Sequence, residues 1–114
     1  MSEVNIDVQK LTKSGLEATY TDDSTLNGSD TFLFVNGNAT FMHVKNGDGS
    51  QHTVTVQTPA TVSGLDVEEL TVDIGAGDEK FIGPFPPGVF NYSSGKAKFT
   101  LDAGTNMEIA ILRV

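Results

Sequence analysis

Residues 31–45 have the sequence TFLFVNGNATFMHVK, and this stretch decides what kind of fold the chain can adopt. The run from Thr31 to Val35 is almost entirely apolar and aromatic, which suits a buried β-strand. Asn36-Gly37 follows it, and an Asn-Gly pair between two strand-like runs is the strongest short signal for a β-hairpin. The run from Ala39 to Lys45 would be the return strand. We therefore expect a hairpin here, and a β-protein around it.

Short strand-like runs continue on both sides of this stretch, and Gly, Pro, Asn or Asp interrupts them about every 8–12 residues, as in sandwiches and barrels. No long segment shows helical periodicity, so we expect no helix. A second hairpin is expected at Asn46–Gly49. The other expected strands are Val4 to Val8, Leu16 to Thr21, His52 to Thr58, Val62 to Val67 around a turn at Gly64, Leu70 to Ile74, Lys80 to Ile82, an edge piece at Val89 to Tyr92, Lys96 to Leu101, and Met107 to Val114.

This pattern predicts an all-β, antiparallel, two-sheet β-sandwich, which would be either jelly-roll-like or immunoglobulin-like. Alternation within the strands predicts their buried faces: Val54 and Val56 in one strand, and Ala97, Phe99 and Leu101 in another. No repeat or linker divides the chain, so we expect one domain over residues 1–114, with residues 1–10 as an extended N-terminal arm.

The composition excludes several classes of function. Fifteen acidic and seven basic residues give a formal charge of −8, and no basic patch interrupts the acidic surface, so we expect no nucleic-acid partner. Apolar runs are only a few residues long, which argues against a membrane-spanning segment. Residues 1–10 lack the basic start and apolar run of a secretory signal. The chain has no cysteine, which excludes disulfides and thiolate chemistry.

The sequence contains no catalytic constellation that we can identify, so we expect a non-enzymatic protein without a cofactor. His43 and His52 could approach each other across the second hairpin and bind a metal together with Asp48, and residues 46–50 faintly resemble a calcium loop. Ordinary strand and turn residues explain both features, because the spacing of known metal motifs is absent. We expect no metal.

The segment from Phe81 to Phe90 contains three Phe and three Pro, and it is the most unusual stretch of the chain. Its rings could plug one end of the sandwich, or they could form a stiff apolar surface for a protein partner, since Pro lowers the entropy cost of binding. The first strand could add to the sheet edge of a neighbour. The residues expected to bind a partner are Phe81, Pro84, Phe85, Pro86, Pro87 and Phe90, together with Val4, Ile6 and Val8.

Four segments resemble small virion proteins of tailed bacteriophages: His52 to Pro59, Leu70 to Gly77, Phe81 to Phe85, and Met107 to Val114. The resemblance implies a capsid decoration (cement) protein, a small β-sandwich that docks on the outside of the phage head and stabilises it. Its implied partner is the major capsid protein, and such proteins act as homotrimers or monomers at symmetry axes. The implied location is the capsid exterior of the virion, after synthesis in the host cytoplasm.

A carbohydrate- or cell-surface-binding module of a tail or fibre is the alternative. Such a module needs a shallow groove with exposed aromatic side chains. Tyr20 and Tyr92 are the only tyrosines and the chain has no Trp, which weakens this alternative.

Overall fold

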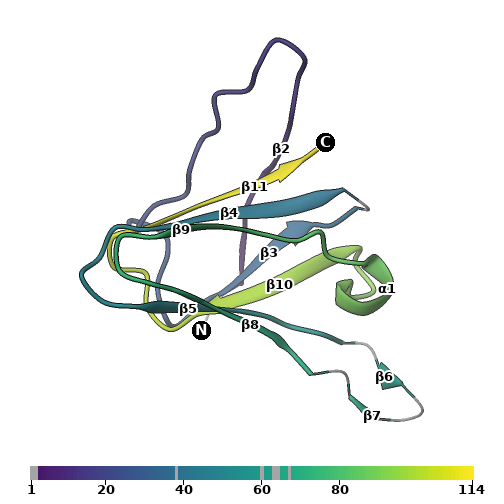
Figure 1. Cartoon of the computed structure of the whole chain (residues 1–114). Helices are drawn as coiled ribbons and strands as arrows, with labels where there is room; N and C mark the ends of the chain where they lie inside the picture. Colours follow the sequence, from purple (N-terminus) through teal and green to yellow (C-terminus); the bar gives the residue numbers. More distant parts are fainter. Residues whose placement is uncertain (1–2, 38, 60, 63–64, 67) are drawn as a thin grey trace.

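The computed structural model describes residues 3–37, 39–59, 61–62, 65–66 and 68–114. Two mixed β-sheets pack face to face, which confirms the predicted β-sandwich (Figure 1). Within the described residues, one sheet has five strands in the order β1-β3-β10-β5-β8, and the other has four in the order β2-β11-β4-β9.

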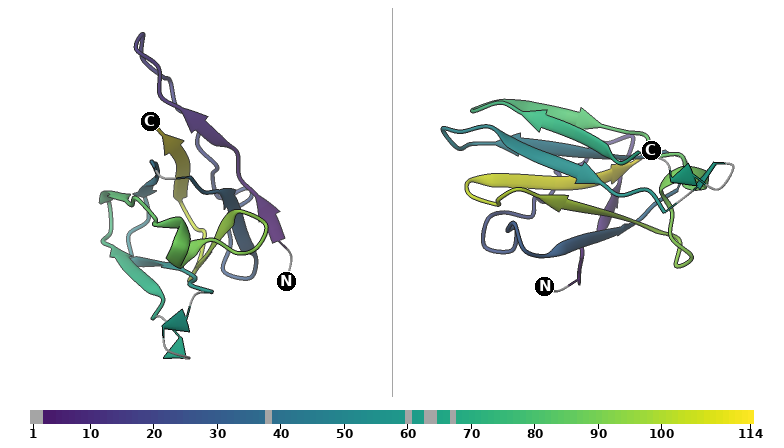
Figure 2. Two further views of the ribbon diagram at one scale, coloured as in Figure 1. Left: turned by 90° about the vertical axis from the view of Figure 1, so that its right-hand side faces the viewer. Right: turned by 90° about the horizontal axis from the view of Figure 1, so that it is seen from below.

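The strands of the five-stranded sheet are β1 (Glu3–Asn5), β3 (Thr31–Val35), β10 (Lys96–Leu101), β5 (His52–Val56) and β8 (Leu70–Ile74). Those of the four-stranded sheet are β2 (Val8–Lys10), β11 (Met107–Arg113), β4 (Thr40–Asn46) and β9 (Glu79–Ile82). A separate pair, β6 (Thr61–Val62) and β7 (Leu65–Asp66), projects from one end of the sandwich (Figures 1 and 2). The predicted turn at Gly64 lies outside the described residues.

Both predicted hairpins are wrong, because each connection crosses from one sheet to the other. Asn36-Gly37 links β3 to β4, which lie in different sheets, and residues 47–51 likewise link β4 to β5. The strand β4 pairs instead with β11 and β9. The tight turns were predicted in the right places, but they serve as arches over the edge of the core.

The buried side chain of Asn36 explains why the first turn is an arch. Its amide nitrogen donates to the carbonyl oxygen of Phe85 at 2.9 Å and to Oδ1 of Asn91 at 2.6 Å. Asn91 returns a hydrogen bond to the carbonyl oxygen of Asn36 at 3.0 Å. These contacts tie the turn to a segment about fifty residues away, so tertiary partners determine how the polar residue is used.

The N-terminal segment also differs from the prediction. The expected strand from Val4 to Val8 is divided into β1 and β2, which join different sheets. β1 runs parallel to β3, and β2 runs parallel to β11, so the sheets are mixed and not purely antiparallel. Residues 3–10 are therefore paired within their own chain rather than extended as an arm.

Two further strand predictions are wrong. In place of the edge piece at Val89 to Tyr92 there is a short helix, α1 (Pro87–Phe90), in which Pro87 occupies the first turn, where its missing N–H costs nothing. Leu16 to Thr21 forms no strand, although Thr21 makes one bridge to Ile109. Residues 11–20 instead extend outward beyond β2 (Figure 2).

The core lies between the sheets and is lined by the predicted strand faces. Val54 and Val56 are fully buried, as are Ala97 and Phe99. Four aromatic rings, those of Phe32, Phe34, Phe85 and Phe99, fill its centre with centroid separations of 5.4–6.0 Å. Alternation along each strand thus predicted the buried faces correctly.

Strand pairing follows a nested order. β3 pairs with β10, β4 with β9, β5 with β8, and β6 with β7. Each pair encloses the next along the chain, as if one long hairpin had been folded over. β10 also pairs with β5, and β11 extends the four-stranded sheet beside β4.

Candidate functional site

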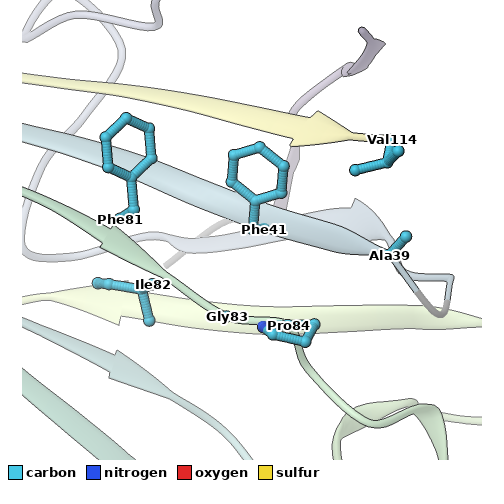
Figure 3. A pocket seen from close by; sticks show the side chains of 7 residues that line it. All are labelled: Ala39, Phe41, Phe81, Ile82, Gly83, Pro84 and Val114. Atoms are coloured by element: carbon cyan, nitrogen blue, oxygen red, sulfur yellow. The ribbon is translucent and has the colours of Figure 1, made fainter.

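An apolar hollow of about 400 Å³ lies on the outer face of the four-stranded sheet, near one end of the sandwich (Figure 3). Three short segments contribute: the start of β4, the end of β9 with the following turn, and the end of β11. None of the described residues that line it has a polar side chain. The hollow is lined by Ala39, Phe41, Phe81, Ile82, Gly83, Pro84 and Val114.

The pairing of β4 with β9 positions the two phenylalanine rings of the hollow. Phe81 lies opposite His43, and the rings of Phe41 and Phe81 are 6.2 Å apart on the same face (Figure 3). Phe81 is 68% exposed, which is unusual for so large an apolar side chain. Gly83 has a φ of +130°, and a Cβ there would lie 3.0 Å from Phe41. A side chain at residue 83 would be strained at this φ and would crowd the Cα and Cβ of Phe41, so glycine is favoured here.

A hydrogen-bonded network supports Phe81 from below. The imidazole of His43 stacks against the Phe81 ring, with centroids 4.1 Å apart and planes inclined by 9°. Nδ1 of His43 is 2.6 Å from the hydroxyl of Tyr20, and Nε2 is 3.0 Å from a carboxylate oxygen of Glu79. The ammonium of Lys45 lies over the Tyr20 ring at 4.2 Å. With both nitrogens bonded, the histidine is held in one orientation and gives Phe81 a rigid base.

The structure separates the predicted partner-binding residues into exposed and buried groups. Phe81 and Pro84 line the hollow, and Pro86 is exposed. Phe85 is fully buried between Phe34 and Phe90, so its ring belongs to the core. Pro87, Phe90, Val4 and Val8 are half-buried and Ile6 is buried; of these five, all but Pro87 belong to the core or pack against it.

Sequence reasoning missed Ala39, Phe41 and Val114 as parts of this surface. A signal for Phe41 existed, because Phe41, His43 and Lys45 alternate with the buried Met42 and Val44. Their outward direction could have been inferred from that alternation. Their proximity to Phe81 could not, since it depends on the pairing of strands far apart in the sequence.

The second histidine forms a separate cluster at the opposite end of the sandwich. His52 is buried, with Nε2 2.8 Å from Asp48 and Nδ1 3.2 Å from Asp102. It lies in the five-stranded sheet and His43 in the four-stranded sheet, so the two histidines do not meet across a hairpin, as a shared metal site would have required. No group of three or more candidate metal ligands occurs among the residues that the structure describes. Because both nitrogens of His52 contact carboxylates, it ties the arch at residues 47–51 to the turn that follows β10.

These contacts predict how stability depends on pH. Hydrogen bonds from His52 and from the Gly49 amide favour the charged carboxylate and hold the pKa of Asp48 below its ordinary value. A carboxyl whose pKa is lowered on folding stabilises the native state above its unfolded pKa. That contribution is lost as the pH falls through the folded pKa, in the acid range below the ordinary pKa of an aspartate.

We expect Asp48→Asn to flatten this acid dependence. The measurement is urea unfolding of the wild type and the variant at pH 7 and at several values below pH 5. The variant should be less stable than the wild type at pH 7, and the two should converge in acid. Asp7→Asn, at an exposed position, is the control and should leave the curve unchanged. A constant difference between wild type and Asp48→Asn at every pH would contradict the assignment.

Comparison with known proteins adds no identification: no family model, curated protein or solved structure matches the chain. In the described part of the chain, no helix has the length and apolar character needed to cross a lipid bilayer. The fold defines the class of protein as a β-sandwich.

Proposed function

We propose that the chain is a non-enzymatic docking module that binds the outer surface of a tailed-phage capsid through the apolar hollow and stabilises the shell. The observation that carries this proposal is the exposed ring of Phe81, stacked on His43 at the edge of a hollow whose described lining residues all have apolar side chains. Partner surfaces commonly place such an aromatic side chain in a complementary pocket, where it supplies a large share of the binding energy.

The architecture supports the same proposal. We infer a jelly-roll-like arrangement from the nested pairing of β3 with β10, β4 with β9 and β5 with β8. Jelly rolls are common in viral capsid and lectin domains, so the fold by itself leaves both kinds of partner open. The resemblance to phage virion proteins favours the capsid, with the major capsid protein as the partner.

The lining of the hollow favours a protein partner over a sugar. Sites for small polar ligands need a few polar groups that fix the orientation of the ligand, and the described side chains that line this hollow supply none. The two tyrosines are half-buried and already engaged: the hydroxyl of Tyr20 with His43, and that of Tyr92 with Gln57 at 3.2 Å. An apolar side chain of a protein is therefore the better occupant.

The test is co-sedimentation of the purified chain with phage shells that lack it, combined with its own mass in solution. We expect saturable binding at a fixed ratio to the shell subunit. That ratio and the mass would distinguish a homotrimer from a monomer at each symmetry site. A folded chain that fails to bind these shells, but binds in a glycan array, would replace this proposal with the sugar-binding alternative.

A further inference from the structure

We propose that an extended segment of the partner protein adds to the four-stranded sheet as a strand beside β9, with an apolar side chain in the hollow and a basic side chain against Glu79. This inference deepens the proposed function and rests on it. It names the mode of docking and the chemistry of the docked segment.

The strand β9 has a free edge. Among the described residues, β9 is an outermost strand of its sheet and pairs only with β4. In the nested order the next pair inward, β5 and β8, belongs to the other sheet, and the innermost pair, β6 and β7, lies apart from both sheets (Figure 1). The edge of β9 therefore remains open to a strand from outside the chain.

The register shows which backbone groups face outward. The amide of Asn46 donates to the carbonyl oxygen of Asp78 at 2.9 Å, and the ladder continues with Lys80 opposite Val44. In an antiparallel pair, hydrogen-bonded and non-hydrogen-bonded positions alternate, so Glu79 and Phe81 direct their N–H and C=O groups away from β4. These two residues present the donors and acceptors that an added strand requires.

The other exposed edge at this side of the sandwich is partly occupied. The ammonium of Lys80 reaches from β9 to the carbonyl oxygen of Asp73 on β8, at 2.7 Å. This contact links the edges of the two sheets and blocks one acceptor on β8. The edge of β9, in contrast, lies beside the apolar hollow.

Charge at this edge selects the kind of segment. Asp73, Asp78 and Glu79 are exposed. Of the nearby cations, Lys80 is bonded to the carbonyl oxygen of Asp73, and Lys45, opposite Glu79, lies over the Tyr20 ring. A second copy of this acidic chain would bring like charges together, which disfavours self-pairing. A segment with Lys or Arg opposite Glu79 would be attracted instead. Glu79 and the hollow lie on the same face of the sheet, so the basic and apolar residues should be two or four positions apart.

Two substitutions at one position separate strand addition from simple filling of the hollow. Phe81→Ala removes the ring but keeps the outward N–H, whereas Phe81→Pro removes both and spares the hydrogen bonds to β4. In co-sedimentation with shells, we expect Phe81→Ala to weaken binding about tenfold. Phe81→Pro should weaken it at least fivefold further, because a partner carbonyl loses its donor. Thermal unfolding must show that both variants are folded.

Val35→Ala is the matched control, since Val35 is also an exposed apolar residue, at 61%, but lies in the five-stranded sheet. It should bind as the wild type does. Equal binding by folded Phe81→Ala and Phe81→Pro would overturn strand addition, while saturable binding of the wild type would leave the proposed function intact.

A random twelve-residue peptide library provides a test that does not depend on shells. The library is panned on the wild-type chain after subtraction on folded Phe81→Pro. Enriched peptides with Lys or Arg two or four positions from Leu, Ile, Phe or Met would support strand addition even if shells do not bind. Failure to enrich any peptide, or enrichment without this spacing, would overturn it.

Discussion

Replacing Phe85 with alanine is expected to lower the free energy of unfolding by about 3–5 kcal/mol. The ring is fully buried, with centroids 5.6 Å from Phe34 and 5.5 Å from Phe90. Removing it leaves a cavity in the centre of the core that the surrounding rings can fill only in part. A small domain has only about 5–15 kcal/mol of stability, so much of it would be lost. Urea unfolding monitored by circular dichroism measures the change.

Phe81→Ala is the control for this experiment, because the two residues lie in one Phe- and Pro-rich segment but differ in burial. We expect Phe81→Ala to lower the free energy of unfolding by less than about 1 kcal/mol. Similar losses for both variants would contradict the assignment of Phe85 to the core and Phe81 to the surface. A binding defect in Phe85→Ala would report on unfolding and not on docking.

The second large effect is expected for Asn46→Asp, which should lower the free energy of unfolding by about 3 kcal/mol or more. Each unsatisfied buried polar group costs about 1–3 kcal/mol, and a charged group costs more. Asn46 is 2% exposed, and its amide group donates to the carbonyl oxygens of Ser50, Ile74 and Gly75 at 2.8–3.2 Å. A carboxylate has no hydrogen to donate to these acceptors and would repel them.

Asn5→Asp is the matched substitution at an exposed position, where Asn5 accepts a hydrogen bond from Lys96. A carboxylate can accept the same bond, so stability should change by no more than about 0.5 kcal/mol. Chemical unfolding of both variants tests the pair. If Asn46→Asp were as stable as Asn5→Asp, the arches around Asn46 would not depend on its hydrogen bonds.

The candidate site could be predicted only in part. The unusual composition drew attention to the segment, and the structure places its Phe81 and Pro84 at the exposed hollow, while their binding to a partner stays a prediction. The same composition could not separate Phe81 from Phe85, since four residues along an irregular segment carry no fixed periodicity. Phe41 and Val114 join the hollow through pairing of β4 with β9 and β11, which no local pattern encodes.

By itself the sequence determined where most of the strands lie and which of their faces are buried, as at Val54, Val56, Ala97 and Phe99. Alternation with period two is a local property, so it survives any arrangement of the strands. Only the tertiary structure decided that the turns at Asn36 and Asn46 are arches between sheets. Residues that reverse the chain do so equally well within one sheet or across two, and the choice depends on which apolar faces can be buried together and which distant partners satisfy the turn's polar groups.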